Sequence, residues 1–471
     1  MEAESEHFVL RGDLGEEAAR AALLNLEQVR AALLTGTWHA QTQPPVKTHV
    51  ILLANELELS GYVRNGVLGY AASDPFEAPL LVASAGTRLD ELAVLKHELA
   101  HHIDNAFLLR QPRWLAEGLA SYLETVTLRR DGGATTLGAV NEGRLSHLRR
   151  APQLELDWVM HLGPELYSLQ RDELEDFYAQ SWLLVHYLVN HRRAQLEAFV
   201  DRLAKAEDPD AAWAQSFGKL GPEQLERELR GYLENGKFNT YAFPLAPLRP
   251  ELRVRPLSRA DALAELALLR SISFGAATPH TAALAALEAE AALRADPTSP
   301  LAAGIWFVTG ARERQAQVAV ARAVVHGHPD DSRGYELLGF ALGAEQLSEQ
   351  IAAFETAVRL APDDARALAQ LSFAELAAGR EADALAAARK AVALAPGNPS
   401  YLDGLALSLA ASGDCTGAPA VEQRAIDMIP EGNKEQLVAH LRERLDEFAQ
   451  ICLAQKGGVR ARFVPAPADA R

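Results

Sequence analysis

The chain has 471 residues, of which 48% are hydrophobic and 23% charged, a composition typical of globular proteins with roughly two to four domains. Its formal net charge of −17 argues against a nucleic-acid-binding surface, which needs clustered Lys and Arg to neutralise phosphates. No run of about twenty apolar residues is present, so we expect no membrane span.

The N-terminal part of the chain alternates between strand and helix patterns. Residues 7–11 predict a strand, residues 16–34 an amphipathic helix, and residues 48–59 a second strand. Glycine-rich turns then separate two shorter predicted strands at 67–72 and 79–85. These elements predict a small mixed sheet within a sheet subdomain of about residues 1–90.

Helical patterns follow this sheet. In the segment 88–109, apolar residues recur three and four positions apart, as on one face of a helix. Pro112 is well placed to open a second helix over 113–130. We therefore expect active-site helices over 88–129 and a helical subdomain over 130–240, which includes a long helix near 172–205.

The composition changes again after residue 240. Residues 241–257 contain four prolines and few helix formers, which predicts a proline-rich linker. Beyond it, prolines recur at intervals of 32, 33, 34 and 34 residues, at Pro297, Pro329, Pro362, Pro396 and Pro430. This period resembles tetratricopeptide repeats and predicts all-α helical repeats with a capping helix over 258–456. An alanine-rich helical bundle is the alternative, and residues 457–471 are expected to be disordered.

The pentapeptide His97-Glu98-Leu99-Ala100-His101 is the strongest chemical signal in the chain. On a helix, residues i and i+4 project from one face, so both imidazoles can reach one metal ion. Zn²⁺ favours such nitrogen ligands, and a catalytic site needs three protein ligands and an open position for water. Glu98 lies beside the first ligand, where its carboxylate can take a proton from that water.

A third ligand must come from elsewhere in the sequence. His102 points about 100° away from His101 around the helix, and Asp104 lies on the same helix, which cannot wrap three of its own side chains around one ion. Glu117 is the best-placed candidate, because it lies on the next helix after a short connection. Gly118 beside it would let the two helix backbones approach closely.

These residues, with the stretch Trp114-Leu115-Ala116-Glu117-Gly118-Leu119-Ala120-Ser121-Tyr122, resemble the gluzincin metallopeptidases. They are most similar to the peptidase MA-like domains that often carry tetratricopeptide repeats. The resemblance covers residues 6–200 and implies an α+β zincin-like fold. It also implies that zinc is the cofactor, that His97, His101 and Glu117 are its ligands, and that Glu98 is the general base.

The sequence departs from these relatives in two places. The 15 residues between His101 and Glu117 make a shorter connection than in the aminopeptidases of this class. Ala116 stands where those relatives carry Asn, and Ser121 is a candidate to supply part of the missing hydrogen bond to the ligands. A Gly-x-Met-Glu-Asn-like stretch, which grips a free substrate N-terminus, is absent, and its absence favours an endopeptidase.

The donor that stabilises the developing oxyanion is less well defined by the sequence. Tyr178 is the first choice, although it fits a surface or core tyrosine equally well, and His186 and His161 are weaker alternatives. The predicted strand at 79–85 precedes the metal helix, as does the edge strand that pairs with extended substrate in zincins. A plain core strand is an equally fair interpretation of it.

We therefore predict a zinc-dependent peptidase whose substrate is a peptide or protein and whose repeats bind substrate or a protein partner. The alternative is a tetratricopeptide scaffold with an inactive or structural zincin domain. The chain has two cysteines, Cys415 and Cys452, which fit one bridge or two free thiols. We expect an exported bacterial protein of the periplasm or cell envelope whose leader is absent from this chain, with a cytoplasmic protein as the alternative.

Overall fold

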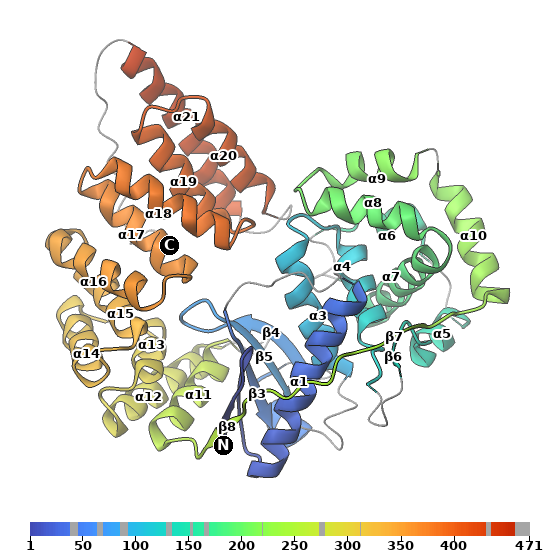
Figure 1. Cartoon of the computed structure of the whole chain (residues 1–471), viewed down its shortest axis with the longest axis horizontal. Helices are drawn as coiled ribbons and strands as arrows, with labels where there is room; N and C mark the ends of the chain where they lie inside the picture. The colour runs from blue at the N-terminus through green and yellow to red at the C-terminus, as the bar shows by residue number, and fades with distance from the viewer. Residues whose placement is uncertain are drawn as a thin grey trace.

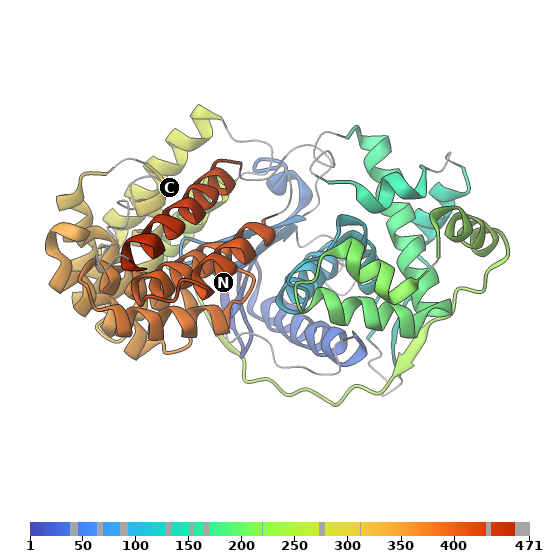
Figure 2. The ribbon, with the colours of Figure 1, turned by 90° about the horizontal axis from the view of Figure 1, so that it is seen from above.

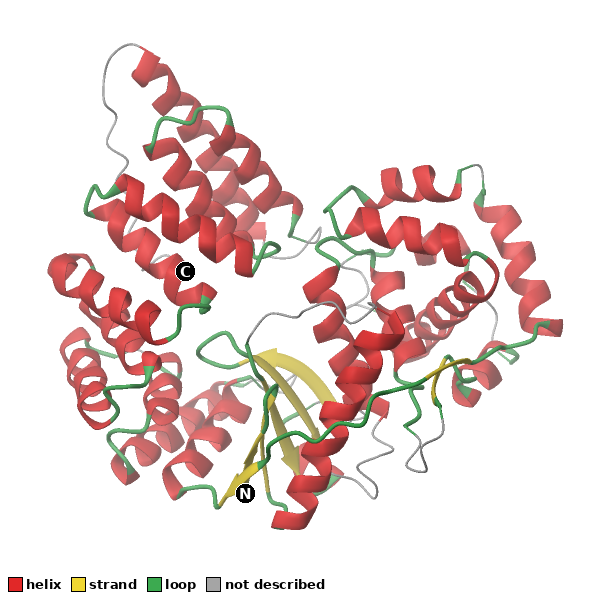
Figure 3. Ribbon diagram, viewed as in Figure 1, coloured by secondary structure: helices red, strands yellow, loops and turns green. Residues whose placement is uncertain are grey.

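The fold combines a small sheet, a helical subdomain and an arc of paired helices (Figure 1). It is taken from a computed structural model. The residues that the structure describes are 1–37, 46–63, 69–84, 93–128, 134–150, 154–163, 169–218, 220–272, 278–310, 312–429 and 435–456. The predicted disordered tail, 457–471, lies outside them. Most of the yellow strands in Figure 3 gather in one sheet with helices on both sides, and a short pair lies apart from it.

Six strands form the main sheet, in the order β4-β5-β3-β2-β1-β8. The central strands β2, β3 and β5 run parallel, whereas β4, β1 and β8 are antiparallel to their neighbours. A second sheet pairs β6 with β7. The strands are β1 (Glu2–Glu4), β2 (Phe8–Gly12), β3 (Thr48–Leu53), β4 (Gly69–Ser73), β5 (Pro79–Ser84), β6 (Thr135–Leu137), β7 (Tyr241–Phe243) and β8 (Arg253–Arg255).

The predicted small mixed sheet is thus confirmed. Strand β5 lies between β4 and β3, so of the two interpretations of residues 79–85 the core strand is correct and the edge strand is not. The edge beside it is β4. Strand order is set by pairing between distant segments, which the sequence pattern of one strand does not encode.

The helices before the repeats form the helical subdomain and cover one face of the sheet, except the short helix that ends at Leu59, which packs on the other face. They are α1 (Glu16–Thr37), α2 (Glu56–Leu59), α3 (Ala93–Phe107), α4 (Arg113–Leu123), α5 (Glu142–Leu148), α6 (Leu156–His161), α7 (Arg171–His191), α8 (Arg193–Leu203), α9 (Pro209–Phe217) and α10 (Pro222–Asn235). The long helix expected near 172–205 is divided into α7 and α8 at Arg192, which adopts a non-helical φ of −135°.

The C-terminal half consists of antiparallel helix pairs, as the proline period predicts. Its helices are α11 (Arg259–Ser271), α12 (Pro279–Ala295), α13 (Pro300–Val308), α14 (Arg314–Gly327), α15 (Ser332–Leu342), the 3-10 turn η2 (Ala344–Gln346), α16 (Leu347–Leu360), α17 (Ala365–Ala377), α18 (Glu381–Leu394), α19 (Pro399–Ala411), α20 (Gly417–Asp427) and α21 (Glu435–Lys456). These pairs form a tetratricopeptide-like repeat region that ends in the predicted capping helix, α21.

The repeat period has a clear structural origin. Pro297, Pro329, Pro362 and Pro396 each lie three residues before the first helix of a pair. Proline cannot continue the preceding helix, so each one separates two repeats. Alanines that recur at about the same period are fully buried in the repeats: Ala357, Ala384, Ala391, Ala418 and Ala425.

The sheet buries both faces, because successive residues of a strand point in opposite directions. On β3, Val50 and Leu52 join the core formed with α1, α3, α4 and α7. Ile51, between them, joins a second core with α11, α12 and α13 of the repeat region. A buried ion pair between Arg11 of β2 and Glu265 of α11 also links the two parts. The first repeats therefore cover the second face of the sheet.

The segment 241–257, expected to be a linker, contributes two strands. Its first residues form β7, and Arg253–Arg255 extend the main sheet as β8 beside β1. Figure 2 shows the segment between them running along the outside of the sheet domain. Arg20 of α1 donates a hydrogen bond to the carbonyl of Leu252 there, which fixes the segment to α1.

Within the described ranges, no helix combines the length and the apolar character needed to cross a membrane. Cys415 is disulfide-bonded, whereas the side chain of Cys452 lies outside the described residues.

Candidate metal centre

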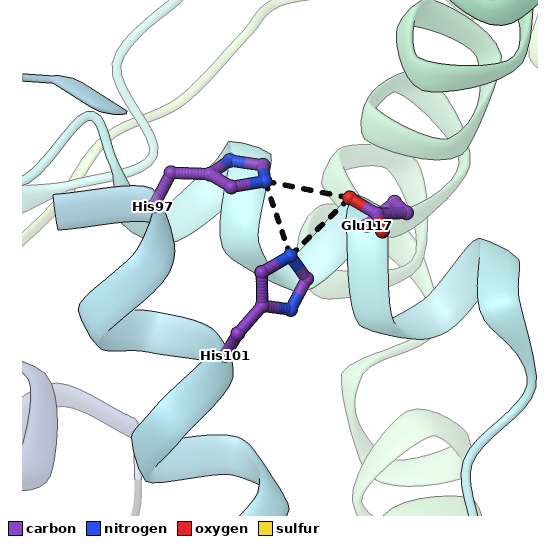
Figure 4. A group of neighbouring side chains, drawn as sticks. All are labelled: His97, His101 and Glu117. Atoms are coloured by element: carbon purple, nitrogen blue, oxygen red, sulfur yellow. Dashed lines mark hydrogen bonds and ion pairs between the residues drawn. The ribbon is translucent and has the colours of Figure 1, made fainter. Parts of the chain in front are cut away.

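Helices α3 and α4 present the predicted ligands to each other. Leu95, Leu99 and Ile103 are buried on one side of α3, which anchors that helix and leaves the His97 and His101 side for the site. Helix α4 begins after Pro112 and carries Glu117 in its second turn. The two helices contact each other along their length, so Glu117 faces the two imidazoles (Figure 4).

The three predicted ligands converge on one point. The Nε2 atoms of His97 and His101 are 3.1 Å apart. Each lies 3.3 Å from Oε2 of Glu117. Among the described residues, these three are the one group of His, Cys, Asp and Glu side chains with metal-binding proximity. Their side chains are 13–18% exposed, so the site is largely desolvated but reachable.

These distances fit a tetrahedral zinc ion. With ligand bonds of about 2.0–2.1 Å, the ligand atoms of a tetrahedral site are roughly 3.3 Å from one another. The observed separations of 3.1 and 3.3 Å are close to that edge length. Three electron-pair donors this close repel one another unless a proton or a cation lies among them, so the donor set suits a metal ion.

Glu124 contacts the ring nitrogen of His97 that points away from the other two predicted ligands. Its Oε2 lies 2.7 Å from Nδ1 of His97, which leaves Nε2 to face the other ligands. Its Oε1 accepts a hydrogen bond of 2.8 Å from Nδ2 of Asn141, the residue that caps α5. Glu124 was not among the residues predicted from the sequence. Its position seven residues after Glu117, on the same helix face, is the signal that could have found it.

Charge neutralisation dominates the electrostatics of the site. Burial alone would lower the pKa of His97, but its hydrogen bonds to the carboxylates of Glu117 and Glu124 outweigh burial and raise the pKa to about 9. Burial would likewise raise the pKa of Glu117, but hydrogen bonds and charge interactions with His101 and His97 hold it well below its usual range. The positive charge of the His97 imidazolium therefore balances negative charge of the carboxylates that contact it.

Glu98 lies next to the ligands but is not one of them. It is partly buried, and burial raises the pKa of its carboxyl group, against the opposing influence of His97 and His101. A backbone hydrogen bond from Ala71 in β4 also opposes the rise in this pKa. Helix α3 packs closely on this strand, because a Cβ added at Gly69 would lie 2.7 Å from Cγ1 of Val94. The edge strand β4 therefore runs beside the predicted general base.

Two smaller sequence predictions about α4 are wrong in detail. Ser121 does not support a ligand, because its buried hydroxyl has no hydrogen-bond partner among the described residues. Glu124 holds the ligand His97 instead. Gly118 does allow a close helix approach, but to α7 and not to α3. A Cβ at this position would lie 2.5 Å from the carbonyl oxygen of Ser181.

Tyr178 is connected to the surroundings of the three predicted ligands through Arg144. It is half-buried on α7, and the guanidinium of Arg144 lies 5.6 Å from the centre of its ring. Arg144 in turn lies 3.7 Å from Oε1 of Glu124. Tyr178 as oxyanion donor therefore stays a prediction. Arg144, a cation two contacts from His97, was missed because α5 gives no catalytic pattern in the sequence.

The rejected and weaker candidates lie away from the ligand group. His102 and Asp104 are not part of it. Burial, with a smaller effect of Arg30, lowers the pKa of His102 to about 4, which keeps this imidazole neutral. His186 is fully buried, and its two nitrogens contact the Tyr232 hydroxyl and the Gly138 carbonyl, so its role is structural. His161 is exposed, with its ring bonded to the carbonyl of Asp157.

The fold and site define a mixed α+β domain with a three-ligand cluster, joined to tetratricopeptide-like repeats. Residues 91–209, which include this cluster, match a family model described as "Protein of unknown function (DUF1570)". No curated protein matches the chain.

Several solved structures resemble the repeat region. A thermophilic TPR protein from Thermus thermophilus is 19% identical, with a TM-score of 0.32, over 41% of this chain and 99% of its own. PilW, a widely conserved type IV pilus biogenesis factor, is 18% identical over 44% and 94%, with a TM-score of 0.33. YrrB, a TPR protein with an unusual peptide-binding site, is 18% identical over 39% and 92%, with a TM-score of 0.29. The helix pairs of this chain, and not these low scores, define its repeat architecture.

Proposed function

We propose that the chain is a zinc-dependent peptidase of the gluzincin type, with an endopeptidase as the favoured form. One observation carries the proposal. Three donor atoms from two helices lie 3.1–3.3 Å apart, at the spacing of a tetrahedral zinc site, with the carboxylate of Glu98 beside them. The motif alone would be weaker support, because the convergence of Glu117 on the histidines depends on the fold.

In this proposal His97, His101 and Glu117 would hold the zinc ion, and Glu124 would keep His97 correctly oriented. Bound zinc acts as a Lewis acid and lowers the pKa of water. Glu98 would accept the proton of the attacking water and deliver it to the leaving amine. Because α3 packs against β4, an extended substrate backbone paired with the free edge of this strand would lie next to Glu98. Tyr178 is the proposed donor to the oxyanion.

The test begins with metal content. The full-length chain is expected to bind one zinc ion, and His101→Gln is expected to lose it. The adjacent His102→Gln is the matched control, because His102 is not part of the ligand group and should be dispensable for zinc binding. Absence of stoichiometric zinc in the parent chain would contradict the proposal.

Activity is tested with an unfolded protein carrying a quenched fluorescent label. Glu98→Gln is expected to retain zinc and to lose cleavage by about 10²–10⁴-fold, the usual contribution of a general base. A Glu98→Gln variant as active as the parent would refute the assigned mechanism. Stoichiometric zinc without cleavage of any protein tested would favour the alternative, a scaffold with a structural zincin domain.

We also propose an exported protein, with a cytoplasmic location as the alternative. Support comes from the bonded state of Cys415, because disulfides persist mainly in oxidising compartments. Mass spectrometry of the unreduced protein tests this point. Two free thiols in protein extracted from its native cells under thiol-blocking conditions would argue against it.

A further inference from the structure

The tip of the β4–β5 hairpin is held inside the arc of repeats. The connection between these strands is the turn 74–78, with the sequence Asp-Pro-Phe-Glu-Ala. Figure 1 shows this loop pointing from the sheet toward the inner side of the helix pairs. Its contacts come from consecutive repeats, although more than 200 residues separate the turn from them in the sequence.

The aromatic residue of the turn lies between two arginines. The guanidinium carbons of Arg333 and Arg366 are 5.7 and 5.8 Å from the ring centre of Phe76. Both lie within the range of cation–π attraction. Gly304 of α13 makes room for the ring, because a Cβ at this position would lie 2.7 Å from it. The repeats therefore accommodate the ring of Phe76 next to two guanidinium groups.

The acidic residue of the turn has its own partners. The hydroxyl of Tyr401 donates a hydrogen bond of 2.7 Å to Oε2 of Glu77. Arg366 lies 3.7 Å from Oε1 of the same carboxylate. Tyr401 is only 6% exposed, so its hydroxyl makes this bond in a largely desolvated place. The carboxylate is thus recognised by one hydroxyl and one guanidinium.

The three recognising side chains occupy related positions in the repeats. Arg333, Arg366 and Tyr401 lie in the first turns of α15, α17 and α19, the first helices of consecutive pairs. Arg333 and Arg366 are 33 residues apart, which is one repeat. We call these first turns the inner face. One side chain from each repeat therefore builds a single composite site.

The turn itself is pre-shaped for this site. Asp74 accepts hydrogen bonds of 2.8 and 2.9 Å from the backbone N–H groups of Phe76 and Ala78. Its second carboxylate oxygen lies 2.9 Å from Nδ1 of His49. Glu77 has a φ of +61°, in the left-handed region that residues other than glycine seldom adopt. The inner face consequently binds a tight turn rather than an extended strand.

We propose that the inner face is a recognition site for a protein partner that presents an aromatic residue followed by a glutamate in a turn. The chain's own turn 74–78 holds the site until such a partner displaces it. The charge and shape of the site support this choice, because its two arginines and its tyrosine match that pair of side chains. Displacement would release β4, the strand beside Glu98, so a partner would also reach the predicted peptidase site. The binding step itself does not depend on peptidase activity.

Binding is tested on the full-length chain with a labelled peptide of residues 73–79, Ser-Asp-Pro-Phe-Glu-Ala-Pro, closed head to tail to keep a turn. Fluorescence anisotropy is expected to show at least tenfold tighter binding to a Phe76→Ala/Glu77→Ala variant than to the parent, since that variant's own turn no longer competes. A peptide with alanine in place of its phenylalanine and glutamate is the matched control. Equal affinity of both proteins, or of both peptides, would overturn the proposal.

The inner face is tested by adding Tyr401→Phe or Arg333→Gln to that variant. Each is expected to weaken peptide binding about tenfold, as for a lost interaction with a charged group. Arg322→Gln is the control, because Arg322 pairs with Glu349 on the exposed surface of the repeats. Unchanged affinity in both inner-face variants would refute the assigned residues. Arg366 is left intact, because it also donates a hydrogen bond to the buried Glu336.

A measurement on the parent chain covers the case in which the double variant does not fold. Excess peptide is expected to speed hydrogen exchange at the β4 amides, 69–73, with no change in α7. Unchanged exchange in β4 at a saturating peptide concentration would overturn the displacement. Neither readout uses a substrate, so failure here is distinguishable from failure of the proposed peptidase function.

Discussion

Replacement of Glu124 tests whether the residues behind the ligands matter for the metal. Glu124 Oε2 lies 2.7 Å from Nδ1 of His97, in a largely buried position. Loss of such a supporting carboxylate usually weakens metal binding by about 10–100-fold, which corresponds to about 1.4–2.8 kcal/mol. The loss of zinc affinity in Glu124→Ala should lie at the upper end of this range, because the substitution also removes the acceptor for the Asn141 amide. Glu124→Gln keeps an acceptor oxygen but no charge, so a loss of about tenfold is expected.

The assay is a competition for zinc between the protein and a chromogenic chelator at fixed pH. Ser121→Ala provides the control, because Ser121 lies on the same helix and is fully buried, but its hydroxyl has no partner among the described residues. Its zinc affinity should stay within about twofold of the parent. This comparison separates the loss of a supporting bond from general disturbance of α4.

Two results would refute the reasoning. In the first, Glu124→Ala would bind zinc as tightly as the parent, so the contact with His97 would not orient a ligand. In the second, Ser121→Ala would lose as much affinity as Glu124→Ala. The effect would then come from repacking of α4 and not from the contact between Glu124 and His97.

Three further predictions concern stability. Gly118→Ala should lower the free energy of unfolding, measured in urea, by about 1–3 kcal/mol, because the added methyl group would collide with the backbone of α7. Gly231 lies in open space on α10, so Gly231→Ala should raise the free energy of unfolding by about 0.5–1 kcal/mol. Burial and the nearby Asp364 raise the pKa of Glu336 to about 8. Because the unfolded chain loses this proton near pH 4.5, the free energy of unfolding should fall as the pH rises from about 4.5 to 8. Glu336→Gln should remove roughly 2 kcal/mol of that fall between pH 6 and 8. Zinc removal by a chelator should lower the melting temperature, since zinc at 100 times its Kd stabilises by about 2.7 kcal/mol.

Each of these predictions has a clear contrary result. Equal destabilisation by Gly118→Ala and Gly231→Ala would mean that helix packing at Gly118 is not tight. An identical pH dependence of the parent and Glu336→Gln would mean that this carboxyl group titrates normally. A melting temperature that is insensitive to both chelator and added zinc would argue against a metal site coupled to folding.

The elements that the sequence predicts well are those defined by local spacing. Leu95, Leu99 and Ile103 predict which side of α3 is buried, because their spacing of three and four residues matches one helix face. The same spacing places His97 and His101 together on the other side. Glu117 could be chosen as their partner because a short connection brings consecutive helices side by side. The repeat boundaries are equally predictable from the sequence, because prolines end the helices at a nearly constant period.

The features that the sequence does not predict depend on pairing between distant segments. Nothing in residues 79–84 indicates that β4 lies outside β5, so the sequence leaves open whether β5 is an edge strand or a core strand. Strand β8 is only three residues long and lies in a proline-rich stretch, and its place beside β1 depends on pairing with that distant strand. The role of Glu124 requires the relative rotation of α3 and α4. The contact between Tyr401 and Glu77 spans 324 residues, beyond the reach of any local pattern.

The apolar layer between the sheet and α11–α13 limits how a chain of this kind can be rearranged in evolution. Repeat arrays are readily gained or exchanged as modules, because each repeat mainly contacts its neighbours. A recombination break within 241–257 would instead uncover the apolar face that contains Ile51 and strip β8 from β1. A new array fused at that point could not cover this surface by chance. The first repeats and the sheet must therefore be inherited together, as parts of one ancestral unit.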